Sequence, residues 1–140
     1  MIEIDDQFFQ NIMSDISLAQ KFLSEILPLE ILREIDLGTI EQLPQSFIES
    51  PSVLPTMDIL YKINWLTRHG HMYLIIELLT EQDPEIQLRM MQYTNDVINQ
   101  HMKNTQDMRN PFVFSFVFYH GEERFKRPVG IMNGIKRVLH

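Results

Sequence analysis

Cysteine is absent from this 140-residue sequence. Its absence excludes a disulfide framework, a thiolate zinc site and a cysteine nucleophile, and it is typical of a protein of the cytoplasm. Uninterrupted apolar runs are also short, and none approaches the roughly 20 residues that cross a bilayer. The acidic N-terminus lacks the positive region that opens a signal peptide. The sequence therefore predicts an unprocessed, soluble, cytoplasmic protein that does not bind membranes.

Positive charge is scarce too, because 12 Lys and Arg face 19 Asp and Glu, which gives a net charge of −7. This balance argues against broad electrostatic capture of nucleic acid. The deficit lies in residues 1–58, which hold 11 acidic and two basic side chains, whereas residues 59–140 hold eight acidic and 10 basic ones. No acidic residue follows position 123. A polyanion, if one binds, is therefore expected toward the C-terminal half.

Amphipathic helices are indicated near the N-terminus, where apolar residues recur at three- and four-residue spacing. Ser14 or Asp15 is a candidate N-cap there, and the Asp15 carboxylate can accept the orphan amide hydrogens of a helix start. This N-cap divides the segment into helices over 5–13 and 16–27. A third short helix is expected over 28–35, and Gly38 is its expected stop.

Strands are indicated in three later parts of the chain. Residues 39–50 predict a weak strand that a proline interrupts, as at the edge of a sheet. Met57–Trp65 and His71–Leu79 flank a short loop and predict a β-hairpin. Residues 111–119 are almost continuously apolar, which is typical of a strand buried on both faces.

A longer helix is expected between the hairpin and the last strand, with Asp83 as its N-cap and Pro84 in its first turn. The order is then α–β–β–β–α–β, which predicts an α/β core of one mixed sheet flanked by helices. With 44% hydrophobic residues, the chain suits one globular domain. The expected domain, residues 1–140, comprises N-terminal helices over 5–35, the hairpin over 57–79, a helix over 84–103, a buried strand over 111–119 and a basic tail over 124–140.

Two carboxylates stand out on the hairpin. Asp58 opens the first strand, and Glu77 lies inside an apolar stretch of the second, where an unpaired carboxylate is costly. A hairpin centred between Thr67 and Arg68 pairs residues whose numbers sum to about 135, which sets Asp58 opposite Glu77. Carboxylates opposed in this way can hold one divalent ion, and oxygen ligands favour Mg²⁺ or Mn²⁺.

A purely structural explanation of Glu77 is the alternative. Its carboxylate can pair with Lys62, with Arg89 or with a tyrosine hydroxyl at the boundary between sheet and helix. Arg89 in turn can form a salt bridge with Glu85, one helical turn earlier, or reach a phosphate group.

The residues around the acidic pair resemble a known family. An aspartate that opens a hairpin, a glutamate in its second strand and a following helix with Arg89 and Tyr93 are similar to the PD-(D/E)XK nuclease fold. More narrowly, the chain resembles the Rpn family of recombination-promoting nucleases, which are also called putative transposases. Matching segments are Asp6–Gln10, Leu18–Leu23, Leu27–Pro28, Leu43–Ile48, Asp58–Tyr61, Tyr73–Glu77 and Val117–Glu122.

The resemblance implies metal-dependent cleavage of DNA phosphodiesters. Asp58 and Glu77 would then hold Mg²⁺ or Mn²⁺, which would activate water and screen the charge on the phosphate. DNA would be the main partner. The residues expected to contact DNA phosphates are Arg89, Arg124, Lys126 and Arg127.

One position departs from the family pattern. Two residues beyond the glutamate, on the same face of the strand, the family usually has glutamine and the wider fold lysine, but here the residue is Leu79. Lys62, two alternations along the strand from Asp58, is the expected catalytic replacement, and Gln82 is the other candidate. Longer members extend well past His140, so a truncated member is expected. The alternative function is a non-catalytic association module that forms a homodimer or binds a longer family protein.

Overall fold

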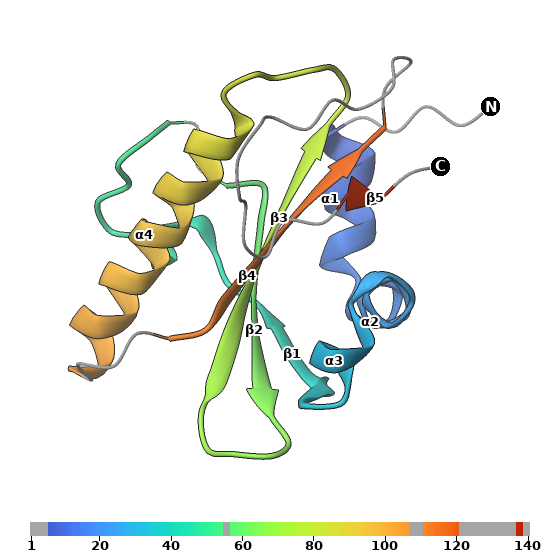
Figure 1. The fold of residues 1–140 in the computed structure, drawn as a ribbon, viewed down its shortest axis with the longest axis vertical. Helices are drawn as coiled ribbons and strands as arrows, with labels where there is room; N and C mark the ends of the chain where they lie inside the picture. The colour runs from blue at the N-terminus through green and yellow to red at the C-terminus, as the bar shows by residue number, and fades with distance from the viewer. Residues whose placement is uncertain (1–5, 55–56, 107–110, 121–136, 139–140) are drawn as a thin grey trace.

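The computed structural model describes residues 6–54, 57–106, 111–120 and 137–138. One five-stranded sheet in the order β1-β2-β3-β4-β5 forms the centre of the molecule, with helices on both of its faces (Figure 1). This is the α/β arrangement that the sequence predicts, and it is compatible with a PD-(D/E)XK-like core. The elements are α1 (Asp6–Ser14), α2 (Ile16–Ile26), α3 (Leu29–Leu32), β1 (Ile35–Gln42), the 3-10 turn η1 (Gln45–Phe47), β2 (Ile59–Trp65), β3 (His71–Leu79), α4 (Ile86–Thr105), β4 (Val113–Tyr119) and β5 (Arg137–Val138).

The hairpin forms where the sequence predicts it. β2 pairs antiparallel with both β1 and β3, whereas β4 runs parallel to β3 and β5 parallel to β4. Ile59 lies opposite Ile76, and Asn64 lies opposite His71. The paired numbers sum to 135, so the predicted register is confirmed.

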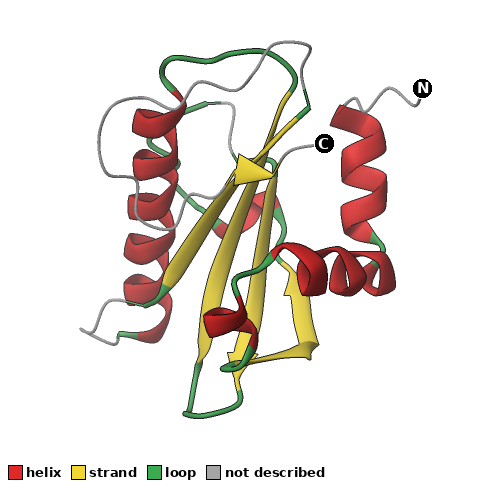
Figure 2. Ribbon diagram, turned by 45° about the vertical axis from the view of Figure 1, so that its right-hand side comes forward, coloured by secondary structure: helices red, strands yellow, loops and turns green. Residues whose placement is uncertain are grey.

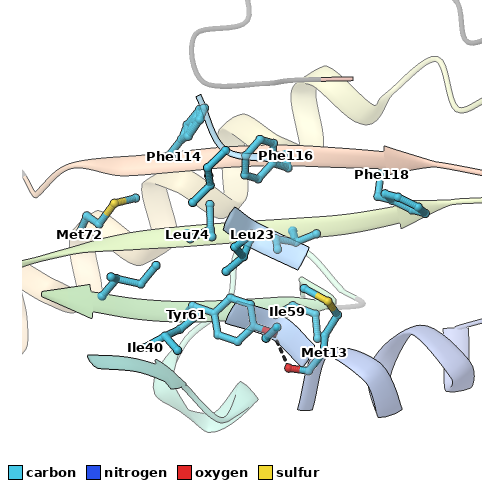
Figure 3. Packing of buried hydrophobic residues seen from close by; sticks show 14 of the residues in the cluster. Met13, Leu23, Ile40, Ile59, Tyr61, Met72, Leu74, Phe114, Phe116 and Phe118 are labelled. Carbon is cyan, nitrogen blue, oxygen red and sulfur yellow. Dashed lines mark hydrogen bonds between the residues drawn. The ribbon is translucent and has the colours of Figure 1, made fainter. Parts of the chain in front are cut away.

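Two apolar layers enclose the sheet, because side chains of a strand alternate between its faces. Helices α1 to α3 lie on one side of the sheet and α4 lies on the other (Figure 2). On the first side Met13 and Leu23 pack with Leu74 and Phe116 (Figure 3). On the second side α4 covers side chains such as Ile75. The described part of β4 is buried on nearly its whole length, as its apolar run predicts.

Tyr61 ties the sheet to the first helix. Its ring is fully buried, and its hydroxyl donates a hydrogen bond to the carbonyl oxygen of Met13 (Figure 3). Met13 belongs to the last turn of α1, whose carbonyl groups lack partners within the helix. Burial raises the pKa of the Tyr61 phenol above its usual value.

Tyr61→Phe is expected to lower the free energy of unfolding by about 1–3 kcal/mol, because it leaves a buried carbonyl without its donor. Urea denaturation measures this loss. The matched control is Tyr119→Phe, which removes the hydroxyl of another buried tyrosine, one that accepts from the partly buried Gln82. A loss for Tyr61→Phe no larger than that of the control would contradict the assigned role.

The boundary between the N-terminal helices and the sheet differs from the prediction. Asp15 caps α2 as expected, since its side chain accepts from the amide of Leu18. The third helix covers only Leu29–Leu32, however, and Gly38 lies inside β1 instead of ending a helix. The predicted strand over 39–50 is likewise wrong in its bounds. β1 is an edge strand with a register shift, and only two of its eight residues are buried, so its sequence lacks a clear apolar alternation.

The start of α4 also differs from the prediction. The helix begins at Ile86, and Asp83 accepts from the amide of Glu85 in the preceding turn instead of capping the helix. The same carboxylate pairs with Arg89 at 2.7 Å, in place of the Arg89–Glu85 salt bridge considered as an alternative. Among the described helices, none has the length and apolar character needed to cross a membrane.

Candidate active site

Asp58 and Glu77 meet at one end of the sheet. Asp58 directly precedes β2, and Glu77 lies near the end of β3. Because Ile59 pairs with Ile76, the antiparallel register places Asp58 opposite Glu77. Their place opposite one another is therefore the one that the sequence predicts.

Reciprocal hydrogen bonds hold the two carboxylates. The amide of Asp58 donates to Oε2 of Glu77 at 2.7 Å, and the amide of Leu78 donates to Oδ2 of Asp58 at 2.9 Å. Each carboxylate thus binds the backbone of the opposite strand. These bonds fix both side chains and use one oxygen of each carboxylate.

Glu77 is strongly perturbed by this environment. Its side chain is buried, with 4% of the residue exposed. Burial, followed by the negative charge of Asp58, raises the pKa of Glu77 to about 9, although the charge of Arg89 acts in the opposite direction. At neutral pH and without a cation, Glu77 therefore keeps its proton.

Helix α4 contributes Tyr93 and Arg89 to the surroundings of the pair. Burial, followed by the negative charge of Glu77, raises the pKa of the buried Tyr93 phenol above its usual value. Arg89 influences Glu77 electrostatically while its guanidinium is paired with Asp83. Two of the structural partners considered for Glu77, the arginine of α4 and a tyrosine hydroxyl, are therefore near it.

Lys62 is not brought to the pair. It faces the same side of the sheet as Asp58, but it lies opposite Tyr73, four residues from Glu77. Four residues of strand correspond to about 13 Å. The Lys62 ammonium instead lies 3.7 Å from Oε1 of Glu41 on β1. The long-range pairing of β1 with β2 creates this contact.

Leu79 lies two residues beyond Glu77 on the face that α4 covers. It is 8% exposed and packs in the apolar layer that contains Tyr93 and Tyr119. Gln82, the other expected replacement, donates to the Tyr119 hydroxyl at 3.2 Å. Arg124, Lys126 and Arg127 lie outside the described residues, so their contacts with DNA phosphates stay a prediction.

A small cavity of about 100 Å³ adjoins Asp58. Gln10 of α1 donates to the carbonyl oxygen of Asp58 at 2.9 Å, and Gln45 of η1 donates to that of Met57 at 3.4 Å. These side chains hold the backbone on which Asp58 stands. Sequence reasoning missed them, because no local pattern connects a residue of the first helix with a hairpin 48 positions later.

The donor set fits a magnesium-type ion. Among the residues that the structure describes, no group of three or more His, Cys, Asp and Glu side chains gathers around one point. Mg²⁺ commonly binds through one or two carboxylates and completes its shell with water and substrate phosphate. Asp58 and Glu77 could supply two such carboxylates, and a divalent charge beside them would favour the ionised form of Glu77 over its protonated form.

Comparisons with known proteins find one family and several relatives. The sequence matches the family described as "Putative transposase, YhgA-like" over residues 4–137. It is 25% identical to the recombination-promoting nuclease RpnD of Escherichia coli O157:H7 over 83% of this chain and 45% of RpnD. It is 29% identical to the inactive recombination-promoting nuclease-like protein RpnE of Escherichia coli K12 over 84% of this chain and 39% of RpnE.

A third relative is the recombination-promoting nuclease RpnA of Escherichia coli K12, which is 27% identical over 84% of this chain and 40% of RpnA. The chain therefore spans less than half the length of the curated relatives that it matches. No solved structure matches it.

Proposed function

Since the chain belongs to the family of YhgA-like putative transposases, we propose that it binds DNA and cleaves its phosphodiester bonds with Mg²⁺ or Mn²⁺. Asp58 and Glu77 are the proposed metal ligands. The observation that carries the proposal is the reciprocal hydrogen bonding that holds both carboxylates at one end of the sheet. Such DNA would be met in the cytoplasm, the compartment that the cysteine-free sequence predicts.

The bound ion and the residues around it would have separate roles. A bound ion would supply Lewis acidity toward the phosphate and lower the pKa of water. Glu77 would release its proton when the ion arrives, because a divalent charge outweighs the burial that now favours its neutral form. Gln10 keeps the backbone of Asp58 in place through its hydrogen bond, so the carboxylate is positioned before the ion binds.

A second candidate function rests on Leu79. An apolar side chain cannot orient a water molecule or offset negative charge, and the 8% exposure of Leu79 leaves it inside the packed layer. Under this proposal the chain has lost catalysis and acts as an association module. Asp58 and Glu77 would then serve only to join β2 and β3.

Glu77→Ala is expected to abolish both Mn²⁺ binding and nicking of supercoiled plasmid, because it removes half of the protein ligand set. Wild type is expected to bind Mn²⁺ and to nick plasmid slowly, since it lacks the polar group at position 79. Calorimetric titration measures the binding, and gel electrophoresis measures the nicking.

The matched control for this experiment is Glu49→Ala. It removes a glutamate that forms an ion pair with Lys103 and is not one of the proposed metal ligands. It is expected to leave Mn²⁺ affinity unchanged. Metal binding that survives in Glu77→Ala would contradict the proposed ligand set. Wild type that binds neither Mn²⁺ nor DNA would favour the association module. A nuclease is expected instead to bind DNA with an affinity that falls as the salt concentration rises.

A further inference from the structure

Helix α4 has two opposite apolar faces. One face packs on the sheet through buried residues such as Ile86, Met90 and Val97. The opposite face carries four apolar side chains with one asparagine among them. At about 100° per residue, this second face lies nearly half a turn from the first. Its residues, which we call the outer seam, are Leu88, Met91, Asn95, Ile98 and Met102.

The outer seam has the spacing of a coiled-coil interface. Its residues follow one another at intervals of three, four, three and four, as the a and d positions of a heptad do. Leu88 is 57% exposed and Met91 is 60% exposed. Figure 1 shows α4 at the side of the molecule, opposite α1 to α3 across the sheet. Exposed apolar side chains gathered on one helix face indicate a surface that another molecule covers.

We propose that the outer seam packs against the same seam of a second copy of this chain. Asn95 is its middle residue, with two apolar residues on each side. A two-fold symmetric pair of α4 helices therefore brings Asn95 close to Asn95 of the partner subunit, whether the helices run parallel or antiparallel. A primary amide both donates and accepts, so the two side chains can satisfy one another.

Charge favours a second copy over a charged partner. Four residues that flank the seam, Gln87, Gln92, Thr94 and Asn99, are uncharged, and the fifth flanking position holds the buried His101. Beyond them, Arg89 is paired with Asp83 and Lys103 with Glu49. Flanking charges select the partner in coiled coils, and like charges would oppose self-association. This face lacks such charges although the chain has a net charge of −7, so a second copy meets no local repulsion.

The expected dimer is reversible. The outer seam spans fourteen helical rises, or about 21 Å, which is short for a permanent interface. This inference does not depend on the proposed nuclease activity. The outer seam lies on the face of α4 that points away from the sheet, whereas the acidic pair lies at the end of β2 and β3.

Sedimentation velocity over a range of protein concentrations tests the proposal. Wild type is expected to pass from monomer to dimer, and Met91→Glu is expected to weaken the dimer about 100-fold, because it buries a charge at the interface. The matched control is Leu66→Glu, which changes a residue of the hairpin loop that is 62% exposed. A wild type that stays monomeric at every concentration, or a dimer equally weakened by the control, would overturn the proposal.

Disulfide trapping tests the position of the axis. The natural sequence holds no cysteine, so Asn95→Cys creates a single thiol in each chain. Under mild oxidation it is expected to form a covalent dimer, whereas Leu66→Cys is expected to do so much more slowly. Equal rates for the two variants would show that Asn95 does not face its counterpart and would overturn the proposed axis. Both sites are exposed, so circular dichroism is expected to show wild-type folding.

Discussion

Leu79→Gln is expected to raise the rate of plasmid cleavage in Mg²⁺ about 100-fold over wild type, the usual scale for one well-placed polar group at a reaction centre. Leu79 shares the α4 side of β3 with Glu77 and lies about 7 Å along the strand. A glutamine amide at this position would add a donor and an acceptor beside the carboxylate pair. The initial rate of conversion of supercoiled to nicked plasmid measures the effect.

Two variants control this experiment. Leu79→Met keeps the side chain apolar at similar volume and is expected to cleave like wild type. Leu79→Gln combined with Glu77→Ala is expected to be inactive, because the added amide acts only beside the acidic pair. Glutamine in a buried layer is expected to cost about 1–3 kcal/mol of stability, so thermal unfolding accompanies each assay. A folded Leu79→Gln variant that binds Mn²⁺ but cleaves no faster than wild type would refute this role for position 79.

The metal-free protein is expected to lose stability as pH rises from about 5 to about 9, and Glu77→Gln is expected to remove most of that loss. Burial raises the pKa of Glu77 from its ordinary 4.5 to about 9 in the folded chain. Over this interval the folded state binds the proton and the unfolded state has released it, so the free energy of unfolding falls as pH rises. The difference is on the order of several kcal/mol, because each pKa unit corresponds to about 1.4 kcal/mol.

Urea denaturation with a chelator present, repeated across this pH range, measures the effect through the fluorescence of Trp65. Glu49→Gln is the matched control. The hydrogen bond and charge of Lys103 lower the pKa of the Glu49 carboxyl, so its contribution is present above the unfolded pKa and lost as pH falls through the folded one. A Glu77→Gln variant with the same pH dependence as wild type would show that Glu77 is already ionised in the folded protein.

The two predictions are linked through the same carboxylate. A proton and a divalent ion compete for Glu77, so metal affinity is expected to increase with pH until the carboxyl is ionised. Cleavage at neutral pH would therefore depend on a divalent ion that binds tightly enough to displace the proton from Glu77. The reciprocal bonds to Asp58 and Leu78 hold the site in shape in either state.

Much of the fold follows from local patterns in the sequence. Apolar residues at helical spacing determine α1, α2 and α4, and the two strand-like runs around a short loop determine the hairpin. The register of that hairpin then places Asp58 opposite Glu77, because a hairpin with a short loop allows few pairings. The family also follows from the sequence, since its motifs are distributed over most of the chain.

The bounds of β1 and the residues around the acidic pair depend on tertiary contacts that local sequence patterns do not contain. The observed bounds of β1 differ from the predicted ones because an edge strand with few buried residues carries little apolar periodicity. The register of β2 and β3 leaves Lys62 four residues from Glu77, and there it pairs with Glu41 of β1. Gln10 of α1 holds the backbone of Asp58. The sequence alone determined which carboxylates stand together, since neighbours in a hairpin are set by local geometry. Only the packing of distant elements decided which other residues surround them, because those contacts depend on the whole sheet and both helical layers.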